Sequence, residues 1–176
     1  RVPPPEGLPG KLDLASTVAG AVAMMVETQQ DGVGLMCLGD GIEEHIPPRQ
    51  GKTHLALLFQ HLSNPPGTGG GSFGDLALEA NKRLGSRGMV FIVTDALDDP
   101  DRLFTALKNM RVREHDVTVL QILDRNEVEF PFDQMTEFRH PESAQKVVGD
   151  PAALRAKYLE RLHGHVDKVE EYCQKA

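Results

Sequence analysis

Apolar positions along the chain recur at helical spacing in five segments. Residues 12–29 are rich in Ala, Val and Met and are apolar around most of the helical circumference, which predicts a buried helix packed on a sheet face. Narrower apolar stripes, typical of surface helices, predict three more helices at residues 53–62, 75–84 and 101–113. Pro151 opens a fifth, terminal helix that extends to about Tyr172.

Shorter apolar runs predict strands between these helices. Residues 33–38 and 42–46 flank Gly39-Asp40-Gly41 and predict an antiparallel hairpin, which Pro47-Pro48 ends at a sheet edge. Residues 89–93 and 117–123 are continuously apolar, as in strands of a parallel sheet that is covered on both faces. Two short segments, residues 128–130 and 137–138, are weaker strand candidates. The order of elements predicts a three-layer α/β fold, with a doubly wound, mostly parallel sheet and one antiparallel edge hairpin.

Length and charge narrow the class of protein. The 176 residues carry 19 Lys plus Arg against 26 Asp plus Glu, a formal net charge of −7, which predicts one soluble domain. The basic residues are scattered, which argues against a nucleic-acid partner. The longest apolar stretch, residues 21–26, is far shorter than the roughly 18 residues of a membrane span. Cys37 and Cys173 match no disulfide or metal pattern, so we expect a reducing, cytoplasmic setting.

Two acids follow the predicted parallel strands, where open α/β sheets bind their ligands. Asp124 follows residues 117–123 and is interpreted as a helix cap. Asp95 follows the other strand, and for it a functional and a structural role stay equally open. The reason is that Asp98, Asp99 and Asp101 already serve the N-terminus of the next helix.

The sequence offers little for catalysis. The glycine-rich loop of residues 67–74 precedes a helix and could cradle a phosphate, but Asp75 follows it where a P-loop carries Lys. Gly51-Lys52-Thr53 resembles the end of a Walker motif whose first glycine is missing, because Ile46 stands there. His54 and His61 do not form a metal-ligand set, and no nucleophile elbow is present. A flexible connector is therefore the favoured interpretation of the loop, and we expect no enzyme.

Several phrases together resemble the bacterial family called domain of unknown function fifty-eight. The resemblance covers residues 11–172 and rests on these phrases: Asp-Gly-Val-Gly-Leu at 31–35, Ile-Pro-Pro-Arg-Gln-Gly at 46–51, the strand 89–95 ending in Thr-Asp, and residues 115–132. The resemblance implies a von Willebrand factor type A-like fold. Such domains often carry a metal-ion-dependent adhesion site, in which hydroxyl and carboxylate oxygens surround Mg²⁺ and leave one position open to a partner.

The resemblance leaves that site incomplete in this chain. It maps the late Asp of the site onto Asp95, and it maps the threonine loop onto residues 69–75, which offer Ser72 or Gly74 and no matching Thr. Asp95 and Ser72 are thus candidate metal-site remnants. The Asp-x-Ser-x-Ser motif is absent, and the central first strand that bears it would lie before Arg1. Residues 1–176 are accordingly expected to be a single domain without its first strand. We expect further polypeptide upstream and exposed edges beside the strands ending at Val93 and Leu38.

Two functions follow as hypotheses. The first is a non-catalytic protein-interaction module that acts with a MoxR-type AAA+ ATPase, the partner implied by the resemblance. It needs no cofactor in this chain, although Mg²⁺ would bind if the missing motif were supplied. The alternative is a nucleotide- or phosphate-binding enzyme that uses the loop of residues 67–74.

Overall fold

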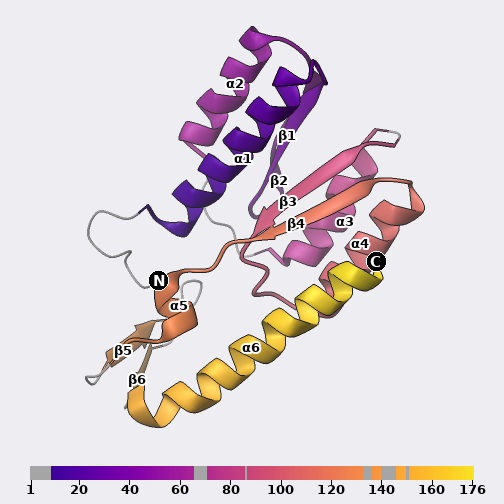
Figure 1. Cartoon of the computed structure of the whole chain (residues 1–176). Coiled ribbons are helices and arrows are strands. Elements are labelled where there is room, and N and C mark those ends of the chain that lie inside the picture. Colours follow the sequence, from indigo (N-terminus) through magenta and orange to yellow (C-terminus); the bar gives the residue numbers. More distant parts are fainter. Residues whose placement is uncertain (1–8, 66–70, 86, 133–135, 140–145, 150) are drawn as a thin grey trace.

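The computed structural model describes residues 9–65, 71–85, 87–132, 136–139, 146–149 and 151–176 (Figure 1). Helices and strands alternate along most of the chain. The helices are α1 Lys11–Thr28, α2 Lys52–Ser63, α3 Phe73–Arg83, α4 Pro100–Val112, α5 Arg125–Glu129 and α6 Pro151–Lys175. The strands are β1 Val33–Leu38, β2 Ile42–Arg49, β3 Met89–Thr94, β4 Asp116–Gln121, β5 Thr136–Arg139 and β6 Lys146–Gly149. No helix in the described ranges is long and apolar enough to cross a membrane.

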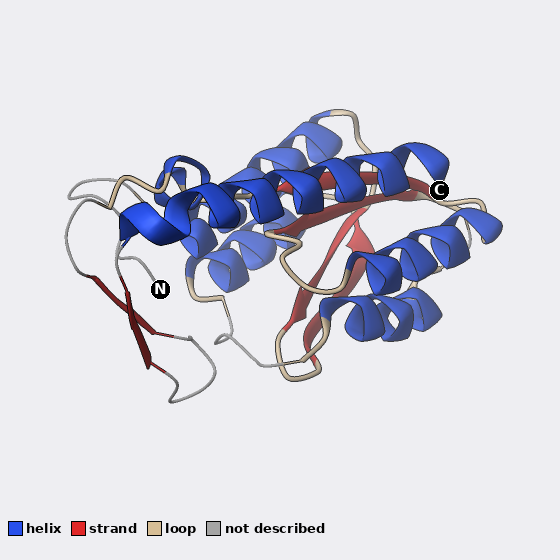
Figure 2. Cartoon of the chain, turned by 90° about the horizontal axis from the view of Figure 1, so that it is seen from below, coloured by secondary structure: helices blue, strands red, loops and turns tan. Residues whose placement is uncertain are grey.

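The strands form three two-stranded sheets within the described ranges. Strands β1 and β2 make the expected antiparallel hairpin, and β3 and β4 pair in parallel, as their continuous apolar runs predicted. The pair β5–β6 is antiparallel and lies apart from the other two sheets (Figures 1 and 2). The fold is therefore mixed α/β. The single continuous sheet that we predicted is not formed among the described strands, because no hydrogen bonds join β1 to β3.

Three predicted boundaries differ from the structure. Residues 128–130 do not form a strand, because Asp124 and Glu127 make a reciprocal capping box that nucleates α5 there. Strand β2 continues through Pro47-Pro48 to Arg49. An edge strand can contain proline, because the backbone groups on its outer edge have no neighbouring strand to bind. Strand β4 ends at Gln121, two residues before the end of the predicted run.

Two hydrophobic clusters hold the molecule together. The larger one packs β3 against α3, α4 and α6; its buried members are Ala77, Ile92, Ala96, Leu103, Ala106, Leu107, Met110 and Val169. The smaller one joins α1, β2 and α2 through Ala23, Ile46 and Leu58. Helices therefore lie on both sides of the strands (Figure 2). Aromatic stacking adds to the larger cluster, because the rings of Phe104 on α4 and Tyr172 on α6 lie 4.4 Å apart.

The expectation that α1 is buried is wrong for most of its surface. Among its eighteen residues Ala23 is buried, whereas Met24 and Met25 are 52% and 56% exposed. The helix contacts α2, β1 and β3 (Figure 1), whereas the side chains of Leu12 and Leu14 are, like the two methionines, exposed. Helix α1 thus has apolar residues around most of its circumference but is not buried around most of it.

A single glycine allows α3 and α4 to cross closely. Gly74 is buried, and a Cβ built on it would lie 2.4 Å from the Cβ of Arg102 and 2.8 Å from the Arg102 carbonyl carbon. Neither contact can be relieved by a change of rotamer, because the Cβ of Arg102 is fixed by its backbone and the second atom belongs to the backbone itself. The spacing of the two helices therefore depends on the missing side chain at residue 74.

Gly74→Ala should reduce the free energy of unfolding by about 1–3 kcal/mol, because the added methyl group must push α4 away from α3. The matched control is Gly164→Ala in α6, where a Cβ meets nothing within 4 Å. That change should instead stabilise by about 0.5–1 kcal/mol through helix propensity. Chemical denaturation of both variants measures the difference, and equal effects would contradict the role of Gly74.

Candidate acidic rim at the carboxyl ends of the strands

The carboxyl ends of β3 and β4 lie at one rim of the molecule, and the loop after β3 is fixed there by neighbouring elements. Ala96 adopts a left-handed φ of 49°. Its carbonyl oxygen lies 2.6 Å from Nε2 of His165 on α6. The side-chain amide of Gln121, at the end of β4, donates to the carbonyl oxygen of Asp95 at 3.0 Å. The loop therefore presents the Asp95 side chain from a well-supported backbone.

Asp95 is engaged by a lysine from the start of α1. The Lys11 ammonium lies 3.1 Å from Oδ2 of Asp95 and 2.8 Å from Oε1 of Glu127. Burial lowers the pKa of Lys11, but Glu127 and Asp95 outweigh that effect, so the pKa is raised and the amine stays charged. The Asp95 side chain remains 45% exposed. Lys11, Asp95 and Glu127 form what we call the Lys11 clasp.

The prediction that Asp124 is a helix cap is confirmed. Its carboxylate accepts a hydrogen bond of 2.7 Å from the Asn126 backbone N–H at the start of α5. Oε2 of Glu127 in turn accepts from the Asp124 backbone N–H at 2.9 Å, while Oε1 of Glu127 binds Lys11. Glu127 is therefore both a member of the Lys11 clasp and the residue that completes the capping box of α5.

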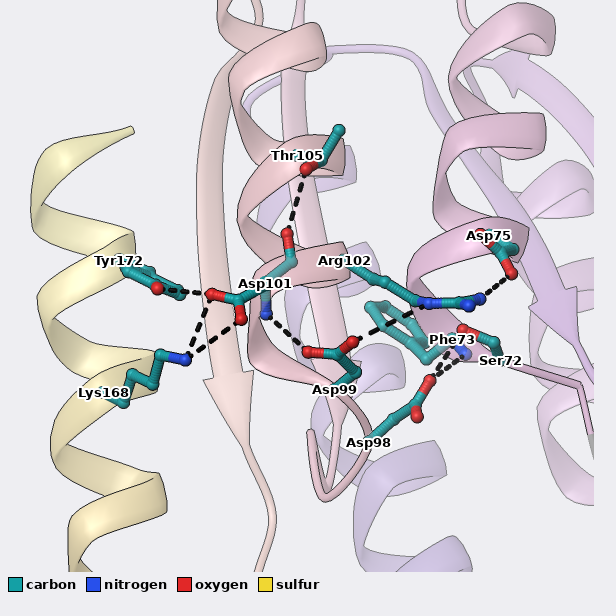
Figure 3. Close-up of polar contacts among 10 residues, drawn as sticks. All are labelled: Ser72, Phe73, Asp75, Asp98, Asp99, Asp101, Arg102, Thr105, Lys168 and Tyr172. Carbon is teal, nitrogen blue, oxygen red and sulfur yellow. Dashed lines mark hydrogen bonds and ion pairs between the residues drawn. The ribbon is translucent and has the colours of Figure 1, made fainter.

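Ser72, the other candidate metal-site residue, binds a different acid, Asp98. Its Oγ donates to Oδ2 of Asp98 at 2.8 Å, and the Phe73 backbone N–H donates to the same oxygen at 2.9 Å (Figure 3). Asp98 thus caps α3 from the loop after β3. Burial works against ionisation of Asp98, but hydrogen bonds from the Asp99 backbone, Ser72 and Phe73 outweigh it and hold its pKa below the usual value.

The other two acids of this loop region also bind separate elements. Asp99 caps α4 as predicted, because its Oδ1 accepts from the Asp101 backbone N–H at 3.0 Å. Asp101 binds α6 through Lys168 at 3.1 Å and the Tyr172 hydroxyl at 2.5 Å (Figure 3). Its pKa is lowered, chiefly by the hydrogen bond from Tyr172. Sequence analysis missed this contact, since its partners lie 67 and 71 positions away.

The described residues do not by themselves make a magnesium site. Mg²⁺ prefers a near-octahedral shell of oxygen ligands. Within the described ranges no three His, Cys, Asp or Glu side chains are grouped so that they could hold an ion. Asp95 binds Lys11 and Ser72 binds Asp98, so the two candidate remnants have different partners. The predicted loop of residues 67–74 lies partly outside the described residues, and its described end, Gly71 to Gly74, leads into the capped start of α3.

Fold and rim together define a class: a mixed α/β domain that presents acidic side chains at the carboxyl ends of parallel strands. The chain belongs to the family described as "Protein of unknown function DUF58", whose family model matches residues 8–168. The comparison with curated proteins gives no match.

A solved structure also resembles this chain in fold. It is the crystal structure of an aerotolerance-related membrane protein from Bacteroides fragilis NCTC 9343 with multiple mutations to serines. The identity is 14% and the TM-score 0.57, and the alignment covers 96% of this chain and 90% of that one. At this level of identity the likeness concerns the fold alone.

The charge on Asp98 should make the capping of α3 dependent on pH. Because the pKa of Asp98 is lowered on folding, its contribution to stability is complete above the usual value of 3.8 and is lost as the pH falls through the lower folded value. Asp98→Asn should therefore lower the melting temperature at pH 7, and its deficit should shrink below about pH 4.

Thermal unfolding from pH 2.5 to 7 measures this effect. Ser72→Ala is the companion variant: it removes one hydrogen bond to Asp98 but keeps the charge, so its deficit should also shrink in acid and should be smaller at pH 7. A deficit of Asp98→Asn that stays constant across this range would show that the cap does not depend on ionisation.

Proposed function

We propose that this chain is a non-catalytic protein-interaction module of the von Willebrand factor type A-like class, which binds its partner at the acidic rim. The partner is a MoxR-type AAA+ ATPase, and the setting is the cytoplasm. Membership of the family supports the class by way of the resemblance that the sequence shows, and the partner rests on that resemblance alone. The parallel order of β3 and β4 supports the place, because ligands of open α/β sheets bind beyond the carboxyl ends of parallel strands.

The observation that carries this proposal is the state of Asp95. Asp98, Asp99 and Asp124 are used to cap helices, and Asp101 binds α6. The Asp95 carboxylate instead caps none of the described helices; it binds the ammonium group of Lys11 and is 45% exposed. An ion pair that is partly open to solvent contributes on the order of 1 kcal/mol, and Lys11 keeps its second partner, Glu127, so a binding partner can take over Asp95 at small cost. Because Asp95 directly follows β3 and caps none of these helices, we expect it to accept a cationic group from a partner in place of Lys11.

The metal-ion-dependent adhesion site stays part of the proposal in incomplete form. Asp95 and Ser72 would contribute oxygen atoms only if the Asp-x-Ser-x-Ser motif were supplied and if Lys11 and Asp98 released them. In its absence the interaction with the partner rests on charge and shape. For that reason we expect partner binding by residues 1–176 to be independent of Mg²⁺.

The alternative, a nucleotide- or phosphate-binding enzyme, finds less support. An anion at the start of α3 would use the backbone N–H groups of the first turn. The Phe73 N–H already donates to Asp98, and Asp75 adds a second negative charge in the same turn. A phosphate would have to displace one carboxylate and approach another.

Asp95→Ala should weaken capture of a purified MoxR-type AAA+ ATPase by about tenfold, the effect expected for loss of one charge-assisted contact. The measurement is a titration of the immobilised chain with the ATPase. Asp31→Ala is the matched control, because Asp31 is exposed in the turn between α1 and β1. Unchanged capture by Asp95→Ala, with a melting temperature close to that of the wild type, would remove the rim from the proposal.

Ligand-dependent melting separates the two functions. A ligand that binds only the folded chain raises the melting temperature by mass action. We expect no shift with ATP and none with Mg²⁺ or Mn²⁺ for residues 1–176, since the rim lacks a grouped ligand set within the described ranges. A shift with ATP that persists without divalent metal would instead favour the nucleotide-binding function.

A further inference from the structure

A cavity of about 280 Å³ lies at the amino ends of β3 and β4, at the opposite end of these strands from the acidic rim (Figure 1). Its lining residues come from the start of β3, the end of α4 and the turn into β4: Arg87, Arg111, Glu114, His115 and Asp116. The two chain segments are joined there, because the Asp116 backbone N–H donates to the Gly88 carbonyl oxygen at 3.0 Å. The cavity, here called the amino-end cavity, is therefore separate from the rim and built on paired backbone.

The turn from α4 into β4 fixes the positions of Glu114 and His115. The His115 N–H donates to the Met110 carbonyl oxygen at 3.1 Å. The Glu114 N–H donates to the Arg111 carbonyl oxygen at 2.8 Å, and Glu114 has a left-handed φ of 63°. These features make a Schellman motif, in which the residue at the place of His115 usually packs an apolar side chain against the helix. His115 is 3% exposed, so the fold buries a histidine where an apolar residue would serve.

The buried imidazole of His115 has unused hydrogen-bonding groups. Among the described residues, neither Nδ1 nor Nε2 has a hydrogen-bond partner, and both atoms are closed to solvent. Buried polar side chains are nearly always paired in folded proteins, so an exception needs a specific explanation. Since His115 belongs to the wall of the amino-end cavity, a rotation of its ring toward the cavity would bring a nitrogen to a ligand there.

Two charges of opposite sign at this cavity are also unengaged. Within the described ranges, neither the Arg87 guanidinium nor the Glu114 carboxylate forms an ion pair or a hydrogen bond. Arg111 and Asp116 form a loose pair, with 3.5 Å between nitrogen and oxygen and side chains that are 53% and 70% exposed. The amino-end cavity thus offers a guanidinium to an anionic group and, separately, a carboxylate to a cationic group.

This combination of charges selects among ligand classes. Phosphate matches poorly, because Glu114 and Asp116 would repel it. A metal ion matches poorly, because no three His, Cys, Asp or Glu side chains in the described part of the chain are grouped to hold one. The terminus of a polypeptide carries one of the two required charges, whereas a zwitterion carries both.

We propose that the amino-end cavity binds a free α-amino acid, whose carboxylate pairs with Arg87 and whose ammonium group pairs with Glu114. A guanidinium can hold a carboxylate through two parallel hydrogen bonds. The His115 ring turns to donate a further hydrogen bond to the same carboxylate. None of these residues belongs to the rim, so the site is independent of the proposed function.

The surroundings of the cavity favour an amino acid with an apolar side chain. Met89 is the register partner of Asp116, so the two side chains project from the same face of the sheet. Met89 is 69% exposed and provides apolar surface beside the cavity. Small-molecule sites usually measure about 300–1,000 Å³, so this cavity lies at the lower end and suits an amino acid better than a nucleotide. L-leucine is therefore the probe of choice.

Titration of isotope-labelled residues 1–176 with L-leucine, followed by NMR, tests the proposal. We expect saturable shifts of the backbone amides of Arg87, Glu114 and His115, with a dissociation constant below about 10 mM. Isocaproate lacks the ammonium group of leucine and isoamylamine lacks its carboxylate, so each should bind at least about tenfold more weakly. Inorganic phosphate should give no saturable shift of these amides.

Variants of the lining residues test the assigned contacts. Arg87→Gln and Glu114→Gln should each weaken leucine binding by about tenfold, because each removes one charge-assisted contact. Both residues are exposed, so their melting temperatures should stay close to that of the wild type. Arg83→Gln is the matched control, because Arg83 is an exposed arginine of α3 that does not line the cavity. His115→Leu should keep or raise the melting temperature, since it removes unpaired polar atoms, and should still weaken leucine binding.

Three results would overturn the proposal. One is the absence of saturable shifts with L-leucine. Another is binding of isocaproate, isoamylamine or phosphate as tight as that of leucine. The last is an unchanged affinity for leucine in Arg87→Gln, Glu114→Gln or His115→Leu. Asp95→Ala should bind leucine like the wild type, so failure of the rim as a partner site and failure of the amino-end cavity are distinguishable.

Discussion

The arrangement of the helices depends on one short acidic segment, the turn that follows β3 and enters α4. Its four aspartates bind four different elements: Asp95 binds α1, Asp98 caps α3, Asp99 caps α4 and Asp101 binds α6. Carboxylates suit this role because each can accept several hydrogen bonds and complements the positive end of a helix. The segment follows β3, which contributes Ile92 to the larger core. This one segment therefore helps to hold α1, α3, α4 and α6 in place relative to β3.

This use of acids limits what the rim can do chemically. A site for catalysis or for a metal needs side chains whose lone pairs converge on one point. Here the carboxylates diverge, each toward the backbone or side chains of its own element (Figure 3). The carboxylates of Asp95 and Asp101 are bound by side chains and not by backbone groups: Asp95 by Lys11 at the start of α1, and Asp101 by Lys168 and Tyr172 on α6. The rim is therefore better suited to recognising a partner than to activating a substrate.

The elements were predictable where local pattern and tertiary environment agree. Apolar spacing gave the helices α2 and α4, the Asp-Gly turn gave the β1–β2 hairpin, and Asp124 was identified as a cap from its position alone. Prediction failed where two local signals compete: residues 128–130 have strand-like composition, yet the capping box at Asp124 and Glu127 decides for a helix. The prediction that Asp98 serves the N-terminus of α4 is wrong, because Asp98 caps α3 instead. That role and the contact of Asp101 with α6 could not be predicted, since the partners lie 25 to 71 positions away.

The exposure of α1 shows what an apolar pattern can and cannot predict. A helix that is apolar around its circumference is normally surrounded by other elements. Here α1 contacts α2 and one strand from each of two separate sheets, and its only buried residue in the described structure is Ala23. The side chains of Met24 and Met25 stay exposed, because the elements that contact α1 cover only part of its surface. The apolar pattern therefore identified the helix correctly but overestimated how much of it is covered.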